Sequence, residues 1–217
     1  MQFTSFKKMI APLRAKIRSL IQRRAILHQK TIPIKQACVK QYGQQYRIHT
    51  LIETGTFRGD MIAAVKDLFH KIYSIELGER LYAEAKKRFD ADKQINIIKG
   101  DSGDKLSQVM QKITEPCVFW LDGHYSGGDT ACGKRESPVL QELQAIFAHP
   151  LKSHIILIDD ARCFDDSNIH ARKERWPSLD DIRNIVEQQP EEWTFEIKDD
   201  VIRIMNRSRE KMNTKPR

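Results

Sequence analysis

From Arg47 onward, the chain alternates between short apolar segments and longer amphipathic ones, and this alternation constrains the fold more than any other feature. Strands are predicted over residues 47–53, 71–76, 95–99, 117–121 and 154–158, and helices over 60–69, 79–89, 105–113, 138–148 and 179–188. Consecutive parallel strands need a crossover connection, which is usually a helix. The pattern therefore predicts an α/β domain with a doubly wound, mostly parallel sheet.

The last two predicted strands differ from the others, because only a short polar turn separates them. Residues 194–197 and 201–205 flank the turn at 198–200, a spacing typical of a hairpin. The sheet is therefore expected to have seven strands, with an antiparallel hairpin at its C-terminal end. In such sheets, ligands bind beyond the carboxyl ends of the strands, where the strand order reverses. Acidic residues end or follow the first five strands: Glu53, Glu76, Asp101, Asp122, Asp159 and Asp160.

The net charge of +8 is concentrated in the N-terminal segment. Eleven of the 37 Lys and Arg residues, and none of the 29 Asp and Glu residues, precede residue 53. Between residues 3 and 20, apolar side chains recur every three or four positions, which predicts an amphipathic helix. Residues 1–32 are therefore expected to form a basic helical arm, an N-terminal extension of a domain over residues 33–217.

The arm is open to three interpretations. A basic amphipathic helix can make peripheral contact with an anionic membrane or bind nucleic acid. It can also pack against its own domain or the second subunit of a homodimer. Because the sequence contains no recognisable RNA-binding module, nucleic acid is not the expected partner.

The cysteines and the hydropathy indicate a cytoplasmic protein. The four cysteines are widely spaced and form no C-x-x-C pair, which argues against a zinc module or a disulfide framework. No apolar run approaches the roughly 18 residues that are needed to span a bilayer. Basic residues also interrupt any candidate signal peptide.

The E-T-G-T-F-R-G segment at residues 53–59, between the first predicted strand and helix, indicates a cofactor site. Glycines in such a turn allow the backbone to turn tightly and to approach a ligand. Glu76 lies twenty-one residues after Gly55, the usual distance for an acid that binds ribose hydroxyls. Together these features predict a cofactor that contains adenosine.

The turn fits S-adenosylmethionine better than a dinucleotide. A dinucleotide site requires G-x-G-x-x-G, whereas this turn has only Gly55 and Gly59. The carboxylate of Glu53 would also repel a nearby pyrophosphate. S-adenosylmethionine has no phosphate and carries an ammonium and a sulfonium group, which a carboxylate attracts. A nicotinamide-dependent (NAD) oxidoreductase is therefore the disfavoured alternative.

At this turn the sequence resembles class I S-adenosylmethionine-dependent methyltransferases, whose pattern is E/D-x-G-x-G-x-G. The pattern aligns with Glu53, Gly55, Phe57 and Gly59, so that Phe57 replaces the middle glycine. The resemblance covers roughly residues 45–206 and implies the Rossmann-like methyltransferase fold.

The resemblance also implies a set of cofactor contacts. The turn after the first strand would surround the methionine part of the cofactor, the acid after the second strand the ribose, and the residues after the third strand the adenine. The residues concerned are Glu53, Gly55, Thr56, Phe57 and Gly59 in the turn, Glu76 at the ribose, and Asp101 and Ser102 at the adenine.

A second constellation follows the fourth and fifth predicted strands. Asp122 and His124 follow the fourth strand, and Asp159 and Asp160 follow the fifth. If these strands are neighbours, the three acids converge at one edge of the sheet. Clustered carboxylates repel one another unless a cation lies between them, and Mg²⁺ prefers such oxygen ligands.

This constellation is similar to that of metal-dependent small-molecule O-methyltransferases of the catechol and macrocin type. The resemblance implies that Asp122, Asp159 and Asp160 bind Mg²⁺ or another divalent cation, which in turn binds the acceptor hydroxyl. Asp122 is further expected to contact the cofactor. Asp122 and His124 are the expected catalytic residues, with His124 taking the proton of the acceptor.

The sequence as a whole predicts an S-adenosylmethionine-dependent O-methyltransferase. Its expected acceptor is a small hydroxylated molecule, such as a sugar or a glycosylated metabolite. The alternative from another class is a catalytically silent binding or scaffold protein that its basic arm recruits. The carboxylates at the strand ends argue against that alternative.

Overall fold

The computed structural model describes residues 31–125, 130–131, 133, 137–165 and 176–209. The chain divides into two compact units, residues 1–37 and 38–217. In the first unit the described residues, 31–37, are helical. The expected basic arm over residues 1–32 lies almost entirely outside the described residues, so its proposed contacts stay predictions. No helix in the described ranges is long and apolar enough to cross a membrane.

The second unit is built on one seven-stranded sheet, which confirms the predicted fold. The strands are β1 (Thr50–Thr54), β2 (Lys71–Glu76), β3 (Ile95–Lys99), β4 (Cys117–Leu121), β5 (Ile155–Ile158), β6 (Trp193–Lys198) and β7 (Val201–Asn206). Their order is β3-β2-β1-β4-β5-β7-β6. Strands β1 to β5 pair in parallel, and β7 is antiparallel to both of its neighbours.

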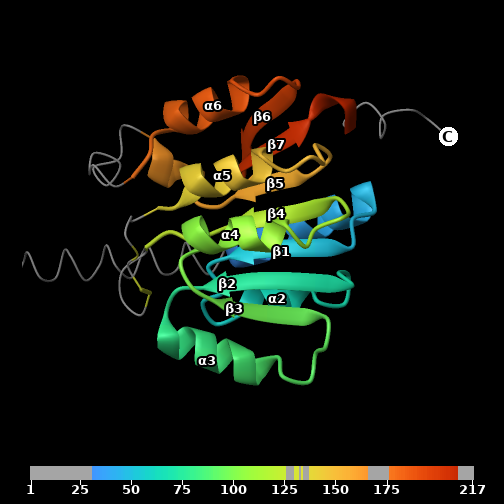
Figure 1. The fold of residues 1–217 in the computed structure, drawn as a ribbon, viewed down its shortest axis with the longest axis vertical. Helices are drawn as coiled ribbons and strands as arrows, with labels where there is room; N and C mark the ends of the chain where they lie inside the picture. Colours follow the sequence, from blue (N-terminus) through green and yellow to red (C-terminus); the bar gives the residue numbers. More distant parts are fainter. Residues whose placement is uncertain (1–30, 126–129, 132, 134–136, 166–175, 210–217) are drawn as a thin grey trace, which may run out of the picture. The chain divides into compact units, whose positions relative to one another are not determined.

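Helices cover both faces of the sheet. They are α2 (Asp60–Val65), α3 (Glu79–Arg88), α4 (Ser102–Met110), α5 (Val139–Phe147) and α6 (Leu179–Glu187), in addition to residues 38–46, which are also helical. Helices α4, α5 and α6 pack on one face, as Figure 1 shows. Residues 38–46, α2 and α3 pack on the other face.

The central strand β4 shows why the apolar runs form the middle of the sheet. All five of its residues are buried. Phe119 and Leu121 contribute to the core beneath α4, α5 and α6, whereas Val118 and Trp120 contribute to the core on the opposite face. A strand that is buried on both faces is stabilised by a continuous apolar sequence rather than an alternating one.

Local side-chain chemistry decides where two helices begin. Helix α4 starts at Ser102, three residues before the predicted start, because the Asp101 carboxylate accepts a hydrogen bond from the Gly103 N–H at 3.0 Å. Helix α6 starts as predicted, with Ser178 and Asp181 forming a reciprocal capping box.

The topology creates one switch point. The chain leaves β1 toward β2 and β3 on one side, and returns to place β4 and β5 on the other. The carboxyl ends of β1 and β4 therefore flank a crevice of the kind in which open α/β sheets bind ligands. All five parallel strands end at the left-hand side of Figure 1.

A buried histidine pair supports the opposite, amino-terminal edge of the sheet. His154 Nδ1 accepts a hydrogen bond from the Cys117 N–H at 3.1 Å, and its Nε2 lies 3.1 Å from His149 Nδ1. The other ring nitrogen of His149 lies 3.2 Å from the Ile113 carbonyl oxygen. Burial lowers the pKa of His154 to about 3, and electrostatic interaction with His149 acts in the same direction.

We predict that His154 makes the fold acid-sensitive. Because the folded state depresses this pKa, the stabilisation is present above about pH 6.5 and is lost as the pH falls toward 3. His154→Asn keeps an acceptor for the Cys117 N–H but cannot titrate. As the pH falls from 6.5 to 5, the free energy of unfolding of the wild type should drop by about 2 kcal/mol relative to that of this variant. Urea unfolding measures this difference. His70→Asn, at an exposed position, is the control, and parallel pH curves would contradict the prediction.

Candidate functional site

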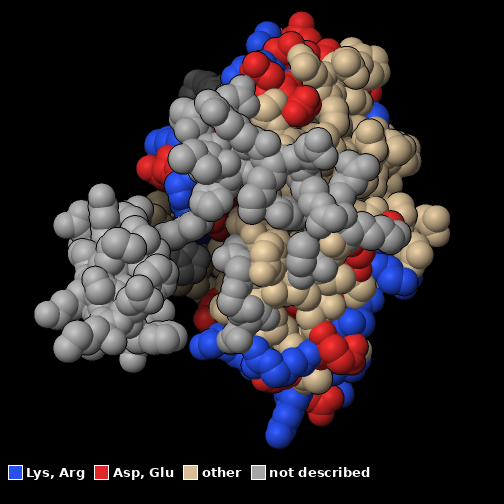
Figure 2. Space-filling view, turned by 90° about the vertical axis from the view of Figure 1, so that its left-hand side faces the viewer, with Lys and Arg blue, Asp and Glu red and all other residues tan. Residues whose placement is uncertain are grey.

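The predicted site residues gather at the carboxyl edge of the sheet. Figure 2 looks onto this edge and shows Lys and Arg side chains beside Asp and Glu side chains around its described parts. The turn after β1 and the end of β4 are in direct backbone contact, since the Asp122 N–H donates to the Thr54 carbonyl at 3.0 Å.

Gly55 is required by this contact. Its φ of 81° lies in the left-handed region, and a Cβ there would overlap the Asp122 carbonyl oxygen. A side chain would therefore push the turn away from β4 as well as strain the backbone. Gly55 allows the first loop and the fourth strand to approach closely enough to share one crevice.

Phe57 departs from the glycine pattern in sequence but not in conformation. Its φ is 48°, in the left-handed region that the replaced glycine would adopt freely. The Phe57 N–H donates to Glu76 Oε2 at 2.8 Å, and the guanidinium of Arg58 lies 5.4 Å from the centre of the phenylalanine ring. These contacts hold the turn in its observed conformation.

Glu76 occupies the position predicted for a ribose-binding acid. It ends β2, is almost fully buried, and also accepts the Gly78 N–H at 2.7 Å on Oε1. Burial raises its pKa, while the hydrogen bonds from the backbone of Gly78 and Phe57 oppose that rise. A carboxylate can accept about four hydrogen bonds, so Glu76 retains the capacity to bind hydroxyl groups.

Glu53 lies beneath the turn and not on its surface. It is 2% exposed and accepts a hydrogen bond from Ser74, whose hydroxyl lies 2.5 Å from Thr56 Oγ1. Burial raises the pKa of Glu53 to about 8; the hydrogen bond from Ser74 opposes the rise and the charge of Glu76 adds to it. Ser74 was not predicted, because a serine inside a strand gives no signal of its own in a single sequence.

Asp101 and Ser102 stand where the adenine contacts were predicted, after β3. Asp101 caps α4, and Ser102, the first residue of that helix, is buried. The side chain of Ser102 faces the main chain of Gly123 at the end of β4. The predicted residues from β1, β3 and β4 are therefore neighbours.

His124 lies between two carboxylates. Its Nδ1 is 3.5 Å from Asp122 Oδ1 and its Nε2 is 3.3 Å from Asp160 Oδ2, while only 7% of its side chain is exposed. The edge of its ring meets the Trp176 ring at a centroid distance of 5.2 Å. The two flanking carboxylates therefore fix the orientation of the imidazole.

The three predicted metal ligands, Asp122, Asp159 and Asp160, lie after β4 and β5, and each of them makes contacts with neighbouring groups. Asp160 is engaged by His124 and by Arg162, whose Nη1 lies 3.0 Å from Asp160 Oδ1 and also pairs with Asp200. Asp159 instead accepts the Asp160 N–H at 2.6 Å. Within the described ranges, no group of three His, Cys, Asp or Glu side chains is arranged to hold a metal ion. The described cationic neighbours of Asp160 are thus the Arg162 guanidinium and, when protonated, the His124 imidazole.

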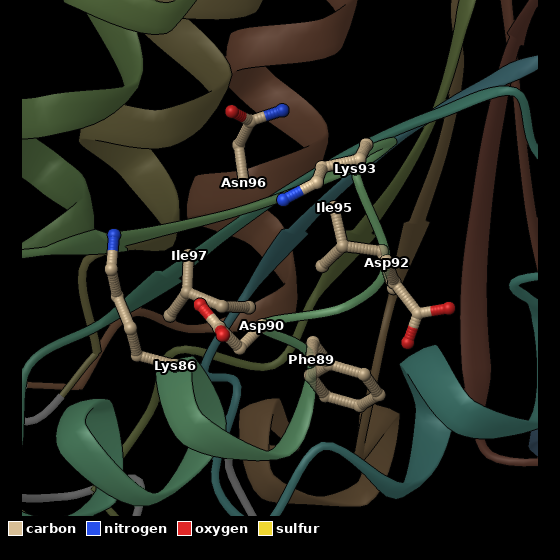
Figure 3. Close-up of a pocket in the computed structure, with 8 residues that line it drawn as sticks. All are labelled: Lys86, Phe89, Asp90, Asp92, Lys93, Ile95, Asn96 and Ile97. Atoms are coloured by element: carbon tan, nitrogen blue, oxygen red, sulfur yellow. The ribbon is translucent and has the colours of Figure 1, made fainter.

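A shallow pocket elsewhere on the second unit is separate from this site. Its lining comes from the end of α3 and from β3: Lys86, Phe89, Asp90, Asp92, Lys93, Ile95, Asn96 and Ile97. Figure 3 shows Lys86 and Asp92 on opposite sides of it. Because Ile95 is the first residue of β3, the pocket lies at the edge opposite the carboxyl ends and takes no part in the predicted chemistry.

Comparison with solved structures identifies the fold. A putative caffeoyl-CoA O-methyltransferase from Staphylococcus aureus is similar with a TM-score of 0.55 and 16% identity, over 92% of this chain and 98% of the other. An O-methyltransferase from Bacillus cereus in complex with SAH gives a TM-score of 0.58 at 12% identity, over 80% and 81%. An SAH-bound methyltransferase from Podospora anserina gives a TM-score of 0.56 at 13% identity, over 79% of this chain and 77% of the other.

These likenesses show that the chain has the class I methyltransferase fold. No model of a known protein family matches the sequence, and no curated protein matches it. At such low identity the shared property is the arrangement of the sheet and helices, as the strand order β3-β2-β1-β4-β5-β7-β6 also shows.

Besides Ser74, three further residues at the site were not predicted. Arg162 follows the acid pair after β5, Trp176 contacts His124, and Glu142 lies on α5 beneath Gly123. Arg162 and Trp176 lie far from the turn at residues 53–59 in sequence, so that only tertiary packing reveals their role. Glu142 did carry a signal, since it is an acid among the apolar positions of an otherwise buried helix face.

We predict that Glu53 destabilises the fold as the pH rises. Its raised folded-state pKa means that its contribution is most favourable below about pH 4.5 and is lost as the pH approaches 8. Between pH 5 and 8, the free energy of unfolding of Glu53→Gln should therefore rise relative to that of the wild type by up to about 1.4 kcal/mol per pH unit. Urea unfolding measures this difference. Glu196→Gln, at an exposed position of β6, is the matched control. A constant difference between Glu53→Gln and wild type would refute the prediction.

Proposed function

We propose that the protein transfers a methyl group from S-adenosylmethionine to a hydroxyl of a small acceptor molecule. The observation that carries the proposal is the joint position of Glu76, the turn at residues 53–59 and His124 around the switch point between β1 and β4. The class I methyltransferase fold and the SAH-bound structures among its neighbours support this choice of cofactor. The name of the Staphylococcus aureus neighbour supports oxygen as the methylated atom.

The cofactor would lie across the carboxyl ends of β1, β2 and β3. Glu76 has remaining acceptor capacity for the ribose hydroxyls, and the turn that it holds through the Phe57 N–H would enclose the methionine part. Glu53, protonated at neutral pH in the free protein because its pKa is about 8, would lose its proton when the cofactor's cationic groups approach. Cofactor binding should then release a proton.

His124 would act as the general base. The acceptor oxygen attacks the methyl carbon of the cofactor, the carbon–sulfur bond breaks, and its electron pair returns to sulfur to give S-adenosylhomocysteine. The hydroxyl proton would pass to Nδ1 of His124, which makes the longer contact of 3.5 Å with Asp122, while Asp160 faces Nε2 at 3.3 Å.

The acids that the sequence predicts as ligands of a divalent ion already have protein partners. Arg162 already neutralises Asp160, and Asp159 is hydrogen-bonded to the backbone of Asp160. A divalent ion bound to Asp160 would have to displace the Arg162 guanidinium. The proposed mechanism therefore takes the proton by the imidazole rather than at a metal-bound hydroxyl.

The first test is cofactor binding by the full chain. Calorimetry should detect binding of S-adenosylmethionine and no binding of NAD⁺, and S-adenosylmethionine should raise the melting temperature. Glu76→Gln should weaken the affinity by roughly tenfold, because one charge-assisted hydrogen-bond acceptor is lost. A wild-type protein that binds NAD⁺ instead, or neither ligand, would overturn the proposed function.

The second test is the role of His124 in turnover. With hydroxylated acceptors and S-adenosylhomocysteine release as the readout, His124→Gln should lower kcat by roughly 10²- to 10⁴-fold. The affinity for the cofactor should stay within about threefold. His70→Gln is the control for loss of an imidazole. An unchanged kcat in His124→Gln would exclude the general-base role.

The third test concerns the metal. Turnover should persist in excess chelator, because proton removal is assigned to His124. A loss of turnover that Mg²⁺ restores would contradict this assignment and return Asp122, Asp159 and Asp160 to the role of ligands.

A further inference from the structure

Glu142 is a buried carboxyl group with no role in the reaction described above. It lies in the first turn of α5, is 1% exposed, and belongs to a helix that packs against α4. A carboxyl group among apolar neighbours is costly to bury unless its polar atoms are well paired. Its surroundings therefore indicate what it does.

Three polar atoms meet at the main chain of Gly123. A Cβ on this glycine would lie 3.0 Å from Ser102 Oγ, 3.1 Å from Glu142 Oε1 and 3.2 Å from Thr54 Oγ1. Each atom comes from a different element: the end of β1, the start of α4 and the first turn of α5. Gly123 itself connects Asp122 to His124. Glu142 thus lies where the loops after β1, β3 and β4 come together.

The contacts of this cluster are close but not ideally aligned. Thr54 Oγ1 and Glu142 Oε1 are both buried, and neither has a well-formed hydrogen bond within the described residues. The hydroxyls of Ser102 and Thr54 nevertheless lie close enough to lower the pKa of Glu142, as does His124. Burial is the larger effect and, with the charge of Asp101, it raises this pKa to about 7.

We infer that Glu142 is a positioning residue that sets the spacing of the three loops that form the cofactor site. Its side chain reaches from α5 to the space beside Gly123, where the hydroxyls of Thr54 and Ser102 also lie. The turn at residues 53–59, the Asp101–Ser102 pair and the Asp122–His124 segment therefore pack around this one side chain. This inference rests on the proposed function, because it concerns the loops assigned to the cofactor.

The reach of the side chain matters more than its charge in this role. Glutamine has the same length and keeps a polar atom at the position of Oε1. Aspartate keeps the carboxyl group but withdraws it by one methylene, so it cannot support Gly123 and leaves Thr54 Oγ1 further from any partner. The two substitutions therefore separate a positioning role from an electrostatic one.

The experiment measures binding of S-adenosylhomocysteine by calorimetry and melting temperature in the full chain. Glu142→Asp should weaken the affinity by about tenfold or more, and Glu142→Gln should stay within about threefold of wild type. Ile146→Val, one turn further along the same buried helix face, is the matched control. It should lower the melting temperature and leave the affinity within about threefold.

Each outcome is distinct. If Glu142→Asp and Ile146→Val change the affinity equally for similar losses in melting temperature, Glu142 is only part of the core and the inference fails. If Glu142→Gln loses as much affinity as Glu142→Asp, the charge and not the reach is what matters, and the inference fails as well. If the wild type itself does not bind S-adenosylhomocysteine, the proposed function fails first. Should Glu142→Asp not fold, Thr54→Val tests the same cluster and should weaken binding in the same direction.

Discussion

The close approach of the β1 turn to the end of β4 is the contact on which the rest of the site depends. Gly55 has no side chain to separate the two backbones, and the Asp122 N–H donates to the Thr54 carbonyl at 3.0 Å. This contact brings the residues after β4 beside the turn that would enclose a cofactor. Without it, His124 and Glu76 would belong to separate surfaces, and the switch point would have no shared crevice.

Two buried polar groups support the end of β1, one on each face of the sheet. Glu53, with Ser74 and Thr56, lies on the face covered by α2, whereas Glu142 lies with Ser102 on the face covered by α4 and α5. Both carboxyl groups have raised pKa values because they are buried. An apolar core would be more stable at these positions. Their presence is therefore better explained by the geometry that they impose on the loops than by stability.

Much of the fold was predictable because it depends on local patterns. The strands at 71–76, 95–99 and 117–121 were predicted with their observed bounds. The strand at 117–121 was the clearest, because all five of its residues are buried and its apolar run contrasts with its polar flanks. The start of α4 was placed three residues late, because the capping hydrogen bond of Asp101 is weaker than periodicity as a signal. The metal site was predicted from the acids at the ends of two neighbouring strands and from a family resemblance, and it stays a prediction; the contact between Arg162 and Asp160 could not be read from the sequence.

By itself, the sequence determined the succession of strands and helices along the chain, the acids at the strand ends and the glycine-containing turn. These features follow from properties of residues that lie near one another in the chain. Only the tertiary structure decided that His124 lies between Asp122 and Asp160, that Phe57 takes the conformation of the missing glycine, and that Glu142 meets Gly123. Such contacts join residues from separate elements, and their geometry follows from how whole helices and strands pack, which no local pattern encodes.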